Sequence, residues 1–356
     1  MLMLRKACLL AIIFLPVIVQ AQPDTAVKTL SILNWDDYLD PLLIEKFERQ
    51  HKVKIKQSFY ESDDYRDELM AAEGGRGYDI VVVSGIMVDS YRRQGWLDTK
   101  PRLANAQYIN ARWEGVFKGC KEYMVPYFWG TLGIAYRHDL LSEPITSWKQ
   151  FFNPSEALTG KIALINSGRD VVSMALKSLG FSANTDDRAE LNEARELLLE
   201  FSSHVKTLNY INFDENSAML SGEVVASMMY SGDTLMLQEL SDDISYVLPD
   251  EGGNIWVDYI GVTSASTQKK VGWAFIDFLN EPENAAQLAQ HIYYATPNIA
   301  AEKLLPKEFI DNSVIYPSNR ALDESEYYQV LSPRTHSRYN SIFAQLKQLQ
   351  LPDETQ

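Results

Sequence analysis

The sequence is short of cysteine, histidine and basic residues, and each shortage excludes a class of protein. It has 2 cysteines and 5 histidines in 356 residues, so a fold held together by several disulfides is excluded. Lys and Arg number 33 against 48 Asp and Glu, which gives a formal net charge of −15. Nucleic-acid binding needs a basic face to neutralise phosphates. The acid excess therefore argues against nucleic acid and fits a cationic ligand better.

Long apolar runs are missing after the N-terminus. A basic pair precedes an apolar stretch from Ala7 to Val19, which is shorter than the roughly 20 residues needed to span a bilayer. This pattern is typical of a secretory signal peptide. We predict a signal peptide over residues 1–21, with cleavage after Ala21, and a mature chain that is soluble outside the cytoplasmic membrane. Cleavage would remove Cys8 and leave Cys120 alone, with no internal disulfide.

The remaining chain has the composition of a globular α/β protein. It is 46% hydrophobic and 11% aromatic, and its length favours two domains. Strand and helix patterns alternate, which predicts α/β architecture with largely parallel sheets. Two segments that combine turn formers with a strand pattern, Pro126–Gly133 and Pro249–Asn254, are predicted crossings between domains. Strands are predicted over 30–33, 53–59, 78–83, 161–165, 223–229, 244–248 and 255–262, and helices over 41–50, 64–73, 170–179, 186–201, 234–240, 270–279, 283–292 and 339–349.

Motifs of enzymes and metal sites do not occur. The histidines are scattered, no pair has metal-ligand spacing, and neither a Gly-x-Ser-x-Gly elbow nor a phosphate loop is present. Cys120 has no His or Asp near it in the sequence, so an enzyme that depends on Cys120 is a distant alternative. We expect a protein that is not an enzyme and needs no metal and no cofactor.

Two clusters combine aromatic rings with carboxylates. Trp35–Tyr38 directly follows a predicted strand and precedes a helix, and ligands of open α/β sheets bind beyond the carboxyl ends of strands. Trp256 and Asp258 are two residues apart and share one face of a strand. A tryptophan face beside a carboxylate is a chemically sensible receptor for an alkylammonium group. Each cluster alone also fits a core tryptophan with a capping or solvated aspartate.

The sequence resembles the periplasmic polyamine-binding proteins, which include the spermidine/putrescine-binding components of importers and a norspermidine sensor. The resemblance covers nearly the whole mature chain and is carried by Leu33–Tyr38, Phe59–Ser62, Tyr78–Ser84, Val125–Gly130, Met174–Gly180, Gly252–Asp258 and Thr296–Ala301. It implies a type II periplasmic binding protein fold, with two α/β lobes, hinge strands between them and a ligand cleft at the interface. We expect lobe 1 over 24–130 and 255–300, and lobe 2 over 131–254 and 301–356, including the C-terminal helices.

The resemblance also implies which residues bind the ligand. Matching positions are Trp35, Asp37, Tyr38, Ser84, Asp170, Trp256, Asp258, Tyr294 and Gln329. We add Asp36 as a reserve carboxylate and Tyr230 as a ring of the wall. Three positions depart from the spermidine binders: Ser167 stands in place of an acid, Ile86 in place of an aromatic, and Tyr230 in place of a tryptophan. These departures leave polyamine binding credible and the preferred ligand open.

The ligand chemistry follows from the cost of burying charge. Each ammonium group of a triamine needs a carboxylate or several acceptors when it leaves water, and Asp37, Asp170 and Asp258 could supply them. The choice among spermidine, norspermidine and putrescine remains open. The identity of the membrane partner is also open: it is either an ABC permease or a transmembrane cyclic-di-GMP signalling protein that controls biofilm formation. Both roles would use closure around the ligand.

Overall fold

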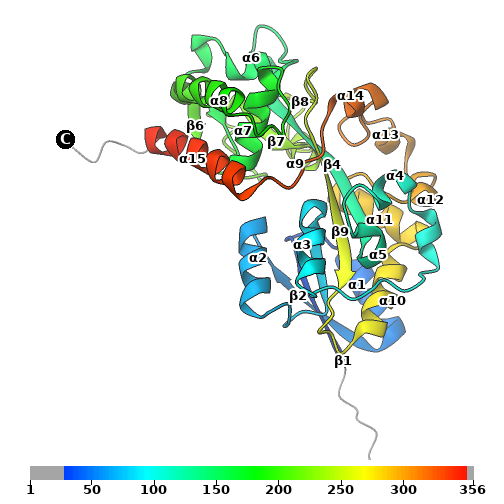
Figure 1. The fold of residues 1–356 in the computed structure, drawn as a ribbon. Helices are drawn as coiled ribbons and strands as arrows, with labels where there is room; N and C mark the ends of the chain where they lie inside the picture. The colour runs from blue at the N-terminus through cyan, green and yellow to red at the C-terminus, as the bar shows by residue number, and fades with distance from the viewer. Residues whose placement is uncertain (1–27, 351–356) are drawn as a thin grey trace, which may run out of the picture.

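The computed structural model describes residues 28–350, which form two lobes on one shared sheet (Figure 1). The predicted signal peptide and Cys8 lie outside the described residues. The strand order is β2-β1-β3-β9-β4-β7-β5-β6, and β8 also pairs with β4. The strands are β1 (Lys28–Asn34), β2 (Val53–Phe59), β3 (Ile80–Ser84), β4 (Val125–Arg137), β5 (Ile162–Ala163), β6 (Val205–Thr207), β7 (Ala226–Tyr230), β8 (Ile244–Val247) and β9 (Asn254–Val262).

Helices cover the sheet in both lobes. Lobe 1 has α1 (Pro41–His51), α2 (Asp63–Ala72), α3 (Val88–Arg93), α4 (Ala111–Glu114), α5 (Cys120–Tyr123), α10 (Lys269–Leu279), α11 (Pro282–Ile292), α12 (Ile299–Glu302) and α13 (Lys307–Ile310). Helix α14 (Asn319–Glu324) ends against lobe 2, where Lys177 donates to the Glu324 carbonyl. Lobe 2 has α6 (Trp148–Phe152), α7 (Gly168–Ser178), α8 (Arg188–Phe201), α9 (Ser231–Gln238) and α15 (Pro333–Gln350). Within residues 28–350, no helix combines the length and apolar character needed to cross a membrane.

The first helix shows how local sequence sets an element. Asp40 accepts a hydrogen bond from the backbone N–H of Leu42 at 2.7 Å, and Pro41 occupies the first helical position, where its missing N–H costs nothing. Leu43 and Phe47 are four residues apart, so they share the buried face of α1. Phe47 packs edge-on against Phe275 of α10 at 4.8 Å between ring centroids. These contacts hold α1 against the core of lobe 1. The loop of residues 35–40 joins this helix to the end of β1.

Two long strands pass between the lobes. Strand β4 pairs with β9 from Val125 to Leu132 and then with β7 from Leu132 to Tyr136. It therefore contains the crossing predicted at Pro126–Gly133. The segment predicted at Pro249–Asn254 joins β8 to β9. The sequence did not predict a third connection, residues 325–332, which joins α14 to α15 and forms a bridge to the start of β9.

The prediction of largely parallel sheets is wrong at the centre of the molecule. Strand β1 pairs in parallel with β2 and β3, but β9 is antiparallel to β3 and to β4, and β4 is antiparallel to β7 and β8. Every residue of β4 except Arg137 is buried. A strand buried on both faces has a continuous apolar sequence whichever way its neighbours run. The sequence pattern therefore could not distinguish the two arrangements.

The C-terminal part of the chain divides differently from the expectation. Leu305 belongs to the core cluster that contains residues of α1 and α10. Val314 and Leu322 belong to a cluster that contains residues of β3 and also Leu235 of α9. Leu305 thus lies against lobe 1, whereas the sequence places 301–356 with lobe 2. At the end of α14, the Glu324 carbonyl accepts a hydrogen bond from Lys177 of lobe 2 at 2.9 Å. Helix α15 packs on lobe 2 through Tyr339 and Phe343. The short connections between α12, α13 and α14 carry no sequence signal for the lobe that they cover.

Candidate ligand-binding site

Five aromatic rings form a row between the lobes, which we call the aromatic row. Its members, in spatial order, are Tyr38, Tyr294, Trp256, Tyr230 and Tyr210. Successive ring centroids are 6.1, 4.8, 6.3 and 6.1 Å apart, mostly with edge-to-face geometry. Tyr38 follows β1, Trp256 lies in β9, and Tyr230 ends β7. The row therefore runs from lobe 1 across a crossing strand into lobe 2.

Two glycines make room for the rings of the row. A Cβ atom at Gly130 of β4 would lie 2.5 Å from the ring of Trp256, and one at Gly232 would lie 2.5 Å from the ring of Tyr294. Real Cβ contacts do not occur at that distance, so a side chain at either position would displace a ring. Gly130 is also the cross-strand partner of Trp256. The absence of a side chain on β4 thus sets the position of the tryptophan.

Asp258 is the carboxylate of the crossing strand. It is 7% exposed, and it lies opposite Ser84 in the antiparallel register of β3 and β9, so the two side chains share a face. Burial raises the pKa of Asp258 to about 7, and the negative charge of Asp63 adds to the shift. Interactions with Arg66, Tyr38 and Trp35 oppose it. The carboxylate is therefore poised to ionise when a cation approaches.

Two further carboxylates lie in lobe 2. Asp170, in the first turn of α7, accepts hydrogen bonds from the hydroxyls of Tyr328 at 2.6 Å and Tyr230 at 3.3 Å. Asp233, in the first turn of α9, accepts from Tyr294 at 2.8 Å and from Tyr210. Burial raises the pKa of both carboxyls, and the hydrogen bonds counter that shift in part.

Asp170, Asp233 and Asp258 together are called the cleft carboxylates. None of the three forms an ion pair with a basic side chain of residues 28–350. Among residues 28–350, no lysine or arginine nitrogen lies within 4.0 Å of their oxygens. Burying a carboxylate without a cation is unfavourable. A ligand that brings ammonium groups would relieve this cost at all three positions. Its methylene segments would pack against the aromatic row.

The other predicted residues occupy different places. Asp36 and Asp37 are exposed on the turn after β1, where Asp37 has a positive φ of 52° and its N–H donates to the Asp36 carboxylate at 3.1 Å. Trp35 is half-buried and packs on Tyr60 at 4.3 Å between centroids. The structure thus brings Trp35 and Tyr38 to Asp258. It leaves the two acids between them at the rim.

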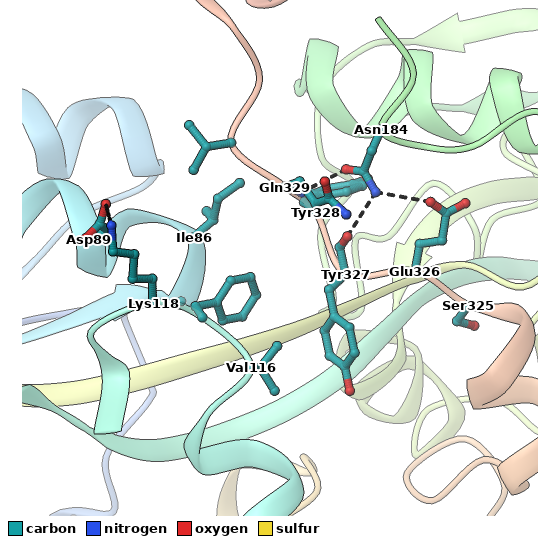
Figure 2. A pocket seen from close by; sticks show the side chains of 13 residues that line it. Ile86, Asp89, Val116, Lys118, Asn184, Ser325, Glu326, Tyr327, Tyr328 and Gln329 are labelled. Carbon is teal, nitrogen blue, oxygen red and sulfur yellow. Dashed lines mark hydrogen bonds and ion pairs between the residues drawn. The ribbon is translucent and has the colours of Figure 1, made fainter. Parts of the chain in front are cut away.

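Gln329 lies on the third connection, between α14 and α15. Its backbone N–H donates to the Asn184 side chain at 2.8 Å. It lines a cavity of about 580 Å³ together with Ile86, one of the departures from the family pattern. Figure 2 shows Ile86 on one side of this cavity and Gln329 with Asn184 on the other. Because the neighbouring Tyr328 donates to Asp170, the third connection borders both the cavity and the cleft.

Sequence reasoning missed three residues of the site: Asp233, Tyr210 and Tyr328. Asp233 had a usable signal, since it lies three residues after Tyr230 at the start of a helix that follows a strand. Such strand ends are where ligands bind in α/β sheets. Tyr328 had none, because it lies in a connection without regular structure. Ser167 remains near the site as the N-cap of α7, where its hydroxyl accepts from the N–H of Asp170 at 3.3 Å.

Cys120 has the properties of a structural cysteine. It is fully buried in the core of lobe 1, and its sulfur lies 4.0 Å from the carbonyl oxygen of Gly85. Burial raises the pKa of the Cys120 thiol to about 12. The thiolate is the nucleophilic form, so Cys120 stays protonated and inert at neutral pH.

A sequence profile of bacterial extracellular solute-binding proteins matches residues 43–315. The chain belongs to this family. Among curated relatives, the spermidine/putrescine-binding periplasmic protein of Escherichia coli (strain K12) is 30% identical over 90% of this chain and 92% of its own length. The norspermidine sensor of Vibrio cholerae is 29% identical over 86% of each chain.

Solved structures agree with this assignment and with the two-lobe α/β fold. A putative spermidine/putrescine ABC transporter protein from Listeria monocytogenes superposes with a TM-score of 0.82 at 32% identity, covering 90% of this chain and 99% of that one. A spermidine/putrescine ABC transporter substrate-binding protein from Streptococcus pneumoniae superposes with a TM-score of 0.80 at 27% identity, covering 91% and 100%. The type II binding protein fold expected from the sequence is confirmed.

Proposed function

We propose that this solute-binding protein works in the periplasm and binds a polyamine of the spermidine or norspermidine class between its lobes. The observation that carries the proposal is the set of three cleft carboxylates along one aromatic row. Asp258 lies in the crossing strand β9 and Asp170 and Asp233 lie in lobe 2, so a linear polycation could neutralise carboxylates from both parts. Relatives named for spermidine, putrescine and norspermidine support the same ligand class.

The protein binds its ligand without transforming it. The cleft carboxylates act as counter-charges, the tyrosine hydroxyls hold them in place, and the rings of the aromatic row contact the methylenes. Trp35, Tyr38 and Ser84 complete the end of the site in lobe 1, and Asp36 and Asp37 attract the ligand at the rim. Cys120 takes no part, because its thiol is buried and protonated.

The ligand-bound form is presented to a partner in the inner membrane. One role is delivery to an ABC permease for import, as the names of the transporter relatives indicate. The other is sensing, in which a transmembrane cyclic-di-GMP signalling protein receives the closed form and adjusts biofilm formation. The norspermidine sensor among the relatives favours this second role.

One experiment tests polyamine binding, and a second distinguishes import from sensing. Calorimetry with Asp233→Asn should show a large loss of spermidine affinity, while Asp250→Asn, which alters an exposed aspartate on the β8–β9 turn, should bind normally. Equal affinities of the two variants would contradict the role given to Asp233.

In a deletion strain, lost uptake of labelled spermidine supports import. Normal uptake with altered biofilm supports sensing.

A further inference from the structure

A groove on lobe 2, away from the ligand cleft, collects arginines on a protein that is otherwise acidic. It lies between α8 and α15, which Figure 1 shows side by side, and has a volume of about 370 Å³. Its charged lining consists of Arg188 and Arg195 from α8 and Arg334 and Arg338 from α15. Among residues 28–350, no acidic residue lines it. We call it the arginine groove.

Helical spacing explains how the arginines converge. Arg188 and Arg195 are seven residues apart on α8, and Arg334 and Arg338 are four apart on α15, so each pair projects from one face of its helix. The two helices pack together through buried side chains, among them Leu198 of α8 and Leu346 of α15. This packing places four arginines along one groove.

Most of this positive charge is not neutralised by the protein. Within residues 28–350, Arg188, Arg334 and Arg338 have no carboxylate oxygen within 4.0 Å. Arg195 contacts Glu196 at 3.8 Å and donates to the Gln345 side chain at 3.4 Å, and Glu196 itself is 67% exposed. Like charges held close together repel each other, so the groove favours an anion that bridges them.

We infer that the arginine groove binds a phosphate-bearing anion. The planar guanidinium fork matches phosphate oxygens with paired hydrogen bonds, and the lining adds the hydroxyl of Ser341 and the amides of Asn192 and Gln345. A monocarboxylate would neutralise only one of the arginines. The anion is either a free phosphate compound or the headgroup of an anionic phospholipid, and both present the same oxygens.

The test compares two double variants with the same change in net charge. Arg334→Gln/Arg338→Gln removes the α15 half of the groove. Arg76→Gln/Arg102→Gln removes two exposed arginines of lobe 1 that likewise lack a carboxylate partner among the described residues. The probes are pyrophosphate by calorimetry and vesicles of phosphatidylglycerol or phosphatidylcholine by sedimentation, all without polyamine. Both variants should fold and bind spermidine like the wild type.

We expect one of the phosphate probes to bind and to lose about tenfold or more in affinity in the groove variant alone, because the lost contacts are charge-assisted. Pyrophosphate binding identifies a free anion, whereas binding to phosphatidylglycerol alone identifies a lipid headgroup. The inference is overturned if neither pyrophosphate nor phosphatidylglycerol binds, if phosphatidylcholine vesicles bind as well as phosphatidylglycerol vesicles, or if both double variants weaken binding equally.

Discussion

At the scale of single residues, the site depends on carboxylates held ready to ionise. Asp258 combines near-complete burial with a pKa raised to about 7, so the ligand-free protein keeps it partly protonated at neutral pH. An arriving ammonium group supplies the charge that burial removed. The same feature costs stability when no ligand is present, and this cost can be measured.

Replacing Asp258 by Asn should stabilise the ligand-free protein at alkaline pH. In the unfolded chain the carboxyl ionises near its ordinary pKa of about 3.9, whereas in the folded protein it keeps its proton up to about 7. Stability therefore falls as pH rises through this window, by about 2–4 kcal/mol in total. Thermal unfolding should give Asp258→Asn a higher Tm than the wild type at pH 8, with the difference vanishing near pH 4. A lower Tm at pH 8 would contradict the buried, uncompensated carboxylate.

Polyamine affinity should weaken as the solution becomes acidic. Binding requires ionised Asp258, and burial also raises the pKa of Asp170 and Asp233. Below the pKa of Asp258 the ligand must displace its proton, which lowers the affinity by up to about tenfold per pH unit. The raised pKa values of Asp170 and Asp233 act in the same direction. Calorimetry in buffers of different ionisation enthalpy should detect proton release at pH 6.5. Affinity that stays constant from pH 8 to pH 5.5 would show that Asp258 does not contact a ligand cation.

At the scale of elements, strand β4 shapes the site without contributing a polar side chain to it. The pairing of Gly130 with Trp256 leaves space for the indole beside the crossing strand. The position of the Trp256 ring therefore depends on Gly130, which has no side chain that could contact the ligand.

Gly130→Ala should lower polyamine affinity by displacing the Trp256 ring. Its new Cβ would lie 2.5 Å from that ring, whereas a Cβ at Gly115 would have no heavy atom within 4 Å. Gly115→Ala is thus the matched control. Aromatic contacts with a cation contribute about 0.5–2 kcal/mol, so a loss of roughly 2- to 30-fold is expected for Gly130→Ala in calorimetry. Equal affinities of the two variants would contradict this role of β4.

Elements with strong local patterns were predictable from the sequence. The helix Pro41–His51 has a capping aspartate, a proline at its first position and a periodic apolar face, and it appears within one residue of the prediction. The predicted strand over 161–165 is reduced to Ile162–Ala163, because two strands flank it only there. The antiparallel pairing of β4 depends on partners more than 100 residues away, which no local pattern encodes.

Several residues named from the sequence lie together in the candidate site. Trp256 and Asp258 share a face as their spacing requires, and Tyr38 and Tyr294 meet in the aromatic row. The exposure of Asp37 was not predictable, because it depends on the left-handed turn that precedes Tyr38. Tyr328 reaches Asp170 from 158 residues away, through a connection that the sequence does not reveal.

At the scale of the whole molecule, the ligand is expected to join the two lobes. The aromatic row runs from Tyr38 at the end of β1 to Tyr230 and Tyr210 in lobe 2. A polycation along it would favour the closed arrangement over open ones, and a membrane partner can recognise that arrangement. Most of the 48 acidic residues contribute only a general attraction for cations that salt screens.

Spermidine should therefore compact and stabilise the protein together. Small-angle scattering should give a smaller radius of gyration with saturating spermidine, and Tm should rise with ligand concentration. Asp170→Asn should reduce both effects, because it removes a counter-charge from lobe 2. A rise in Tm without any compaction would show that the ligand binds one lobe alone.

The central claim is that the cleft carboxylates and the aromatic row form a polyamine site. Its most direct test is calorimetry of the purified protein at pH 8 with spermidine, norspermidine and putrescine, alongside Asp258→Ala. We predict one-to-one binding of at least one triamine with micromolar or tighter affinity, and its loss in Asp258→Ala. Binding of none of these polyamines, or unchanged binding in Asp258→Ala, would contradict the account.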